Sequence, residues 1–250
     1  MYSTLRASVY IYVYKVLRMF VKNLLADTFH LFYPHQCTGC GSDLIAKGSL
    51  LCINCLSELP HTRFAIHENN YVENIFRGRI DVKAAHSEFY FSKGQLVQHL
   101  IHQLKYKANK EIGYCLGEIM GNSLLTSSRF INIDYLVPLP LYADKEFKRG
   151  YNQAKIICDG IGKATQIPTM NENIIRQRAT ETQTRKHRSD RWKNVDGSFA
   201  VTNPASLTGK NILLVDDVIT TGASLEACGQ TILQVAGTSL SIAALAHATK

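Results

Sequence analysis

The sequence lacks an apolar run of the about 20 residues that a membrane-spanning helix needs. Its most apolar early stretch, residues 9–16, is interrupted or closely followed by Lys15, Arg18 and Lys22. No small-residue cleavage site follows, which argues against a secretory signal. Internal repeats and low-complexity segments are also missing. We therefore expect a cytoplasmic protein with no transmembrane segment and no secretory leader.

Acidic residues are in the minority, with 20 Asp and Glu against 28 Lys and Arg and a formal net charge of +8. This excess favours an anionic partner, and nucleic acid, an acidic membrane surface and a polyphosphate all remain open. Hydrophobic residues make up 46% of the 250 positions, enough to bury one substantial core and one small module.

The N-terminal extension, residues 1–32, contains apolar side chains at helical spacing between positions 17 and 32. An amphipathic helix packed on the core would produce this pattern, and so would a helix lying on a membrane surface. Met19 is an alternative start, because a helix beginning there loses no obvious element.

Seven cysteines in a chain without a secretory signal indicate a reducing compartment, with thiols used for metal binding or packing. Four of them form two Cys-x-x-Cys pairs separated by eleven residues, namely Cys37 with Cys40 and Cys52 with Cys55. Two such pairs supply the four thiolates of a closed tetrahedral Zn²⁺ site. A redox dithiol would need a thioredoxin-like pattern, which is absent. We predict a structural zinc in a module spanning 33–60.

The rest of the chain alternates strand-like and helical patterns, which predicts an α/β fold with a parallel sheet flanked by helices. Residues 61–80 show little periodicity and are interpreted as a linker, and 81–250 as the α/β domain. Apolar periodicity disappears between Arg176 and Asn194, which favours a mobile loop.

A buried strand is predicted over 211–215, followed by two acids, a small polar turn and a helix beginning near Ala223. Ligands of open α/β sheets bind at the carboxyl ends of strands, and a helix N-terminus there suits a phosphate group. Two carboxylates beside a phosphate need another partner, and a vicinal diol with Mg²⁺ bridging to a diphosphate would supply it. The residues assigned to this site are Asp216, Asp217, Thr220, Thr221, Gly222, Ala223 and Ser224.

This pattern of strand, two acids, two apolar residues and Thr-Thr-Gly resembles the phosphoribosyl-diphosphate signature of type I phosphoribosyltransferases. A Walker-type phosphate loop does not fit, because the Gly-x-Gly-Lys at 160–163 ends a helix and lacks the following hydroxyl residue.

Further segments are similar to the ComF family, which combines a zinc-ribbon module with a phosphoribosyltransferase-like domain. They are the cysteine pairs with Leu59-Pro60, and the segments 104–107, 137–141, 148–154, 182–184, 191–195 and 197–199. Their joint order covers the chain from about Leu24 to its end. The resemblance implies a link to DNA uptake and natural transformation.

The same resemblance implies roles for two further groups of residues. The segment 137–141 corresponds to a diphosphate-binding loop, to which we assign Pro138, Leu139, Lys148 and Arg149. The basic stretch occupies the place of a flexible loop closing over the diphosphate, to which we assign Arg185, Lys186, Arg188 and Arg191. Seven Lys and Arg against two acids between Arg176 and Lys193 favour an anion, although a solvated charged loop stays open.

One departure from the family pattern concerns catalysis. Purine phosphoribosyltransferases often place an acidic base where this chain has Thr220, so purine salvage is disfavoured and no catalytic residue is assigned. Three functions remain: a Mg²⁺-dependent phosphoribosyltransferase, a non-catalytic phosphoribosyl-diphosphate sensor, and a single-stranded DNA-binding module that works with DNA-uptake proteins. Tyr106, Tyr151 and Trp192 are candidate stacking residues for the last, although each also fits a structural role.

Overall fold

The computed structural model describes residues 14–15, 18, 36–177 and 198–248. The chain forms two compact units, Met1–Leu56 and Ser57–Lys250. Most of the predicted N-terminal extension lies outside the described residues, as do the four predicted loop cations, Arg185, Lys186, Arg188 and Arg191. Within the described residues, no helix has both the length and the apolar character needed to cross a membrane.

The larger unit is built on a parallel sheet with strand order β1-β6-β5-β2. Its strands are β1 (Ala85–Phe91), β2 (Tyr135–Pro138), β5 (Asn211–Ile219) and β6 (Ser239–Ala248). The central strands β5 and β6 are nearly continuous buried apolar runs, as expected for a sheet covered on both faces. The predicted parallel sheet is confirmed.

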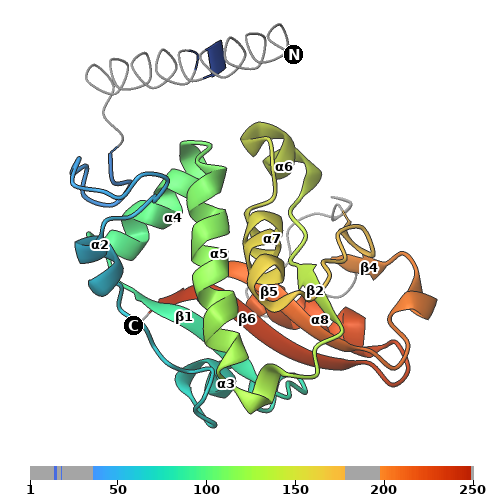
Figure 1. Ribbon diagram of the computed structural model, residues 1–250. Coiled ribbons are helices and arrows are strands. Elements are labelled where there is room, and N and C mark those ends of the chain that lie inside the picture. Colours follow the sequence, from blue (N-terminus) through green and yellow to red (C-terminus); the bar gives the residue numbers. More distant parts are fainter. Residues whose placement is uncertain (1–13, 16–17, 19–35, 178–197, 249–250) are drawn as a thin grey trace, which may run out of the picture. The chain divides into compact units, whose positions relative to one another are not determined.

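Helices cover both faces of this sheet. Helices α4 (Leu96–Tyr106), α5 (Lys110–Leu125) and α7 (Gln153–Thr165) lie together on one side (Figure 1). Helices α3 (Tyr71–Phe76) and α8 (Ala223–Leu233) pack on the opposite face, where their side chains share one core with alternate residues of β5 and β6. The remaining elements are α2 (Ile53–Ser57), α6 (Ala143–Arg149) and the antiparallel pair β3 (Ile174–Arg176) and β4 (Phe199–Val201).

Glycines bring α5 and α7 into backbone contact. A Cβ atom on Gly117 would lie 2.4 Å from the carbonyl oxygen of Ile157, and one on Gly160 would lie 2.2 Å from that of Tyr114. Side chains at these two positions would force the helices apart. The close contact fixes α7 and therefore the residues at its N-terminus, which face the candidate site.

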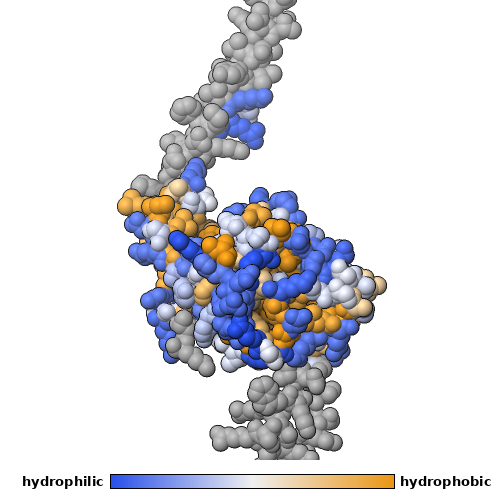
Figure 2. Space-filling view, turned by 90° about the horizontal axis from the view of Figure 1, so that it is seen from below, coloured by the Kyte–Doolittle hydropathy of each residue, from blue (hydrophilic) through white to orange (hydrophobic). Residues whose placement is uncertain are grey.

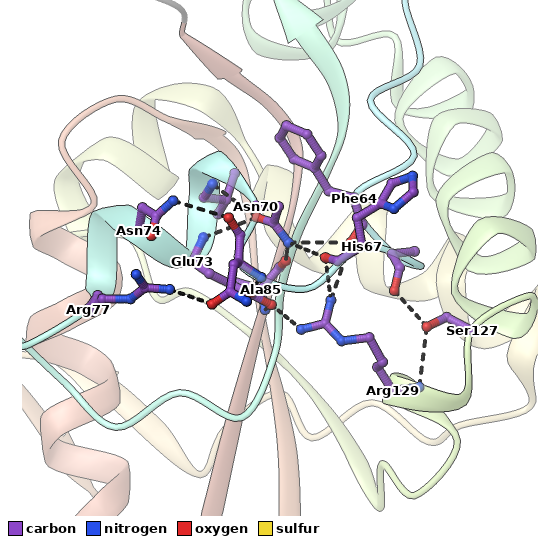
Figure 3. Close-up of polar contacts among 12 residues, drawn as sticks. Phe64, His67, Asn70, Glu73, Asn74, Arg77, Ala85, Ser127 and Arg129 are labelled. Atoms are coloured by element: carbon purple, nitrogen blue, oxygen red, sulfur yellow. Dashed lines mark hydrogen bonds and ion pairs between the residues drawn. The ribbon is translucent and has the colours of Figure 1, made fainter.

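The segment interpreted as a linker, 61–80, contains α3. Asn70 caps this helix by accepting hydrogen bonds from two of its N–H groups, and its Nδ2 donates to the carbonyl oxygen of Ala85 at 2.9 Å. Figure 3 shows that Arg129 reaches Glu73 of α3 as well as the carbonyl oxygen of His67. This segment is therefore folded against the sheet.

The surface carries both polar and apolar regions. Figure 2 shows hydrophilic side chains in a band across the middle of the face seen from below, with hydrophobic side chains beside it. Large exposed apolar side chains of the larger unit include Phe147, Ile131 and Leu125.

Candidate phosphate-binding site and metal centre

The four paired cysteines converge in the smaller unit. The Sγ atoms of Cys37, Cys40, Cys52 and Cys55 all lie within 4.8 Å of one another, so they could hold one metal ion. Burial opposes ionisation of Cys37, but backbone N–H groups of Cys40, Cys52 and Gly39 lower the pKa of its thiol to about 6. One such donor, the Cys52 N–H, lies 3.2 Å from the Cys37 sulfur. Burial and the hydrogen bond with Cys37 raise the pKa of the Cys55 thiol in the same cluster. The fit to Zn²⁺ therefore rests on the set of four soft sulfur donors close together.

The candidate phosphate site begins where β5 ends. The turn after Ile219 leads into α8, whose N-cap position is Gly222 with a φ of +75°. Only glycine adopts this left-handed conformation without strain. A hollow of about 80 Å³ lies at this turn and is lined by Asp216 and residues 218–225. The structure therefore brings six of the seven predicted phosphoribosyl-diphosphate residues to one hollow.

The seventh residue, Asp217, points the other way. The strand predicted over 211–215 extends to Ile219, so both acids lie inside it, and adjacent side chains of a strand point to opposite faces. Ile212 and Leu214 pack in the core beneath α8, which places Asp216 on that face and Asp217 on the face of α7. The two carboxylates do not line the same hollow.

Ionisation of the Asp216 carboxyl is opposed by its surroundings. Burial raises the pKa of its carboxyl to about 7, and the charge of Asp217 adds to the rise. The positive charges of Lys105 and Arg176 act in the opposite direction. A carboxyl in this state gains from any ligand hydroxyl or cation that approaches it.

Asp217 is held by two helices. The Lys105 Nζ, near the end of α4, lies 2.8 Å from its Oδ1, and the Gln153 Nε2, at the start of α7, donates to its Oδ2 at 3.0 Å. Asp217 is only 6% exposed. The Gln153 Oε1 atom is buried and has no hydrogen-bond partner within the described part of the chain. Lys105 was not assigned to the site from the sequence, because its partner lies 112 positions away.

The predicted diphosphate loop lies beside β5. Pro138 is paired with Val215 in the sheet, and the Leu139 N–H donates to the Val215 carbonyl oxygen at 2.8 Å. The Asn152 Nδ2 donates to the Leu139 carbonyl oxygen at 3.0 Å and so fixes the loop. Two of the four predicted loop residues are therefore adjacent to the strand that carries Asp216.

The other two predicted residues of this group, Lys148 and Arg149, lie in α6. The guanidinium of Arg149 stands 5.8 Å from the ring centroid of Tyr106, which is exposed. Neither cation lines the hollow at the β5–α8 turn or the pocket beside the Pro138 loop. Their part in a diphosphate site therefore stays a prediction.

Arg176 is the described cation of the basic stretch. Its guanidinium lies 3.9 Å from the ring centroid of Tyr142 and 5.0 Å from that of Phe199. With Pro138 and Pro140 it lines a pocket of about 390 Å³. The composition of the basic stretch was visible in the sequence, but the pairing of Arg176 with Phe199 in the β3–β4 pair was not.

No protein-family model matches the chain. The chain is 30% identical over 138 residues to the DNA utilization protein YhgH of Escherichia coli K12, which covers 54% of this chain and 60% of that protein. It is 26% identical over 207 residues to competence protein F of Haemophilus influenzae, covering 78% of this chain and 83% of that protein. With competence protein ComFC of Bacillus subtilis it shares 31% identity over 99 residues, or 40% of this chain and 38% of that protein.

The solved structures that the chain resembles weakly include two with phosphoribosyl chemistry in their names. Glutamine phosphoribosylpyrophosphate amidotransferase from Bacillus subtilis has a TM-score of 0.38 and 16% identity, over 53% of this chain and 26% of that one. Adenine phosphoribosyltransferase from Saccharomyces cerevisiae has a TM-score of 0.36 and 15% identity, over 58% and 71%.

The strand order, the flanking helices and the four-cysteine cluster define a class: an α/β domain built on a parallel sheet covered by helices, with a small N-terminal cysteine module. The chain is a homologue of competence protein F, competence protein ComFC and DNA utilization protein YhgH. The resemblance stated from the sequence is thereby confirmed.

Proposed function

We propose that the chain binds phosphoribosyl diphosphate together with Mg²⁺, with the 5′-phosphate in the turn between β5 and α8. The observation that carries this proposal is the open hollow at that turn, which Asp216 and residues 218–225 line. Backbone N–H groups at the start of α8 and the hydroxyls of Thr220, Thr221 and Ser224 are the donors that a phosphate monoester requires.

Asp216 is the acceptor for the ribose hydroxyls in this proposal. It lines the hollow, and its raised pKa means that a hydroxyl donor or a cation nearby relieves an existing penalty. Asp217 starts from a satisfied state, bound to Lys105 and Gln153. The first role of Asp217 is to hold the end of β5 between two helices. Asp217 contacts the sugar or the metal only if its ion pair with Lys105 is broken and the ligand takes the place of Lys105.

The diphosphate occupies the space beside the Pro138–Leu139 loop in this proposal. Parallel pairing of β2 with β5 places that loop next to Asp216, at the carboxyl edge of the sheet where α/β proteins bind ligands. Arg176 and Lys155 both line the pocket beside the loop and are described cations that can supply charge. Lys148, Arg149 and the four loop cations are the further candidates for closing over the diphosphate.

Mg²⁺ would supply Lewis-acid stabilisation of the diphosphate, and Asp216 offers the hard oxygen ligand it prefers. If the domain catalyses phosphoribosyl transfer, carbon 1 of the ribose passes through an oxocarbenium-like state while the protein excludes water. Position 220 holds a threonine, so this turn provides no carboxylate base for a purine acceptor.

Calorimetric titration with phosphoribosyl diphosphate, with and without Mg²⁺, tests the binding proposal. The expected result is Mg²⁺-dependent binding that is lost in Asp216→Ala and retained in Asp144→Ala, an acid of α6 outside the hollow. No heat of binding in the wild type under either condition would overturn it. Release of diphosphate above the uncatalysed rate with a defined acceptor separates an enzyme from a sensor.

The smaller unit supports a second part of the proposal, a structural Zn²⁺ held by Cys37, Cys40, Cys52 and Cys55. The four sulfurs are close enough for a single ion, and a closed set of four thiolates leaves no open position for chemistry. All seven cysteines are free thiols in the structure, which suits a reducing, cytoplasmic setting.

A second candidate function is binding of single-stranded DNA in DNA uptake. The names of the relatives, DNA utilization protein and competence protein, favour it. So does Tyr106, an exposed ring beneath Arg149 at the end of α4, because a ring next to a cation suits a nucleobase and its phosphate. Tyr106→Ala and Arg149→Gln should then both weaken oligonucleotide binding, and Tyr106→Ala should leave phosphoribosyl-diphosphate affinity unchanged. Equal oligonucleotide affinity of both variants and the wild type would remove this candidate.

A further inference from the structure

Arg79, which follows α3, contacts the turn at which the phosphate is proposed to bind. Its Nη1 donates to the carbonyl oxygen of Thr221 at 3.1 Å and to that of Ile75 at 3.0 Å. Its Nη2 forms an ion pair with Glu226 of α8. One guanidinium therefore joins α3, the turn and the first turn of α8, across 147 positions of sequence.

The backbone of the same turn rests directly on α3. A Cβ atom at Gly222 would lie 2.9 Å from the Phe76 Cε1 and 3.0 Å from the Ile75 Cγ2. Phe76 is fully buried, so it has little room to move away. The position of the turn is thus set by its contact with α3 and by the guanidinium of Arg79, which follows that helix.

Glu226 creates a difficulty for an anion at this place. It lies in the first turn of α8, where a carboxylate is favourable for the helix dipole but would repel a phosphate arriving at the same N-terminus. The ion pair with Arg79 cancels that charge. Because Glu226 is half-buried, solvent screens its charge only in part, and the neutralising partner has to come from the protein.

We propose that Arg79 is a positioning residue for the phosphate turn. It fixes the Thr221 carbonyl, which turns the neighbouring N–H groups toward the ligand, and it neutralises Glu226 so that the N-terminus of α8 accepts a phosphate monoester. This inference rests on the function proposed above and adds the part of the chain that prepares its 5′-phosphate site. Arg79 itself touches no reacting atom.

The test compares ribose 5-phosphate, phosphoribosyl diphosphate and inorganic diphosphate as ligands of the full chain. In Arg79→Gln, the Kd for the two ligands that carry a 5′-phosphate should rise about tenfold or more, equivalent to about 1.4 kcal/mol. The Kd for inorganic diphosphate should not change, because that group binds at the other end of the site. The double variant Arg79→Gln with Glu226→Gln should recover part of the lost affinity, and Arg79→Lys should lose less than Arg79→Gln. General damage to the fold would produce none of these differences between ligands or variants.

Arg77→Gln is the matched control, since Arg77 has the same charge two positions earlier and donates to Asn69. Its affinities should equal those of the wild type. Wild-type binding of phosphoribosyl diphosphate that is unchanged in Arg79→Gln would overturn the positioning role alone, whereas a wild type that binds none would overturn the proposed function. Should Arg79→Gln fail to fold, Glu226→Gln decides: affinity for ribose 5-phosphate at or above the wild-type value is expected, and a loss would contradict the charge argument.

Discussion

Lys105 and Asp217 form an ion pair, with 2.8 Å between Nζ and Oδ1, that ties the end of α4 to the C-terminal part of β5. The pair is mostly buried, and its carboxylate also accepts from Gln153. Tyr151 donates to the carbonyl oxygen of Leu104, so the turn that carries Lys105 is itself held in place. The carboxyl edge of the sheet therefore has a fixed cation below it, on the face away from the proposed phosphate.

Loss of Lys105 should leave Asp217 charged and poorly solvated. Because breaking one side of a mostly buried pair removes the compensation for the other, Lys105→Met should lower the free energy of unfolding by about 2 kcal/mol at neutral pH. Lys107→Met, two positions later and exposed, is the matched control and should change stability little. Urea unfolding followed by circular dichroism measures both. Equal stability of the two variants would mean that the pair contributes nothing.

Stability should depend on pH through Asp216. The folded-state pKa of about 7 lies above the ordinary value of 3.8, so the native state holds this proton longer than the unfolded chain does. The contribution of Asp216 is thus fully present below pH 3.8 and is lost as pH rises to about 7. Asp216→Asn should therefore gain stability relative to the wild type across that window and keep a constant advantage above it. A difference that is flat with pH, measured by thermal unfolding from pH 4 to 8, would show that the carboxyl titrates normally.

Removal of metal should affect the smaller unit first. A strong chelator should release about one Zn²⁺ per chain, as measured by elemental analysis, and should leave the sheet of the larger unit folded. Cys37→Ser should abolish retention of the metal, because it removes one of the four ligands. Cys115→Ser, which alters a thiol of α5 outside the cluster, should retain it. Metal-free wild-type protein purified without chelator would rule the zinc site out.

The contact between α5 and α7 should tolerate no side chain on Gly160. Its Cβ would meet the backbone of α5 at 2.2 Å, so Gly160→Ala should destabilise the fold by about 3 kcal/mol despite the gain in helix propensity of about 1 kcal/mol. Gly113→Ala is the comparison, because its Cβ would meet side-chain atoms of Leu104 and Ile156 and no backbone atom closer than these. Chemical denaturation should rank Gly160→Ala as clearly the less stable. The opposite order would show that the helices adjust their separation easily.

Periodicity predicted the long elements well. The expected alternation of helical and strand-like patterns includes α5 (Lys110–Leu125), with buried residues at helical spacing, and β6 (Ser239–Ala248), a nearly continuous buried run. Both elements bury a continuous set of apolar residues, which leaves a strong trace in sequence. Helix α3 left no such trace, because it has six residues of which only Val72 and Phe76 are buried. Its place in the fold depends on the cap Asn70, which also bonds to Ala85, and on the ion pair between Glu73 and Arg129.

The part of the candidate site that is made of consecutive residues could be predicted from the sequence. The contacts between residues far apart in the sequence could not, because they depend on the fold. Thr220 to Ser224 are consecutive, so their turn was visible as a motif, and the structure brings them to one hollow with Asp216. The orientation of Asp217 depends on how far β5 continues past Val215, which is set by pairing with β6. Lys105 and Arg79 reach the site from other elements, and nothing near them in sequence indicates their partners.

Gly222 lies in direct contact with Phe76, and this has an implication for how such chains can diverge. A stretch that only joined two domains would accept insertions and deletions freely. Residues 71–80 cannot accept them, because every added or lost residue there would move the helix against which the proposed phosphate turn packs. Length variation between the cysteine module and the sheet should therefore be confined to positions before Asn70.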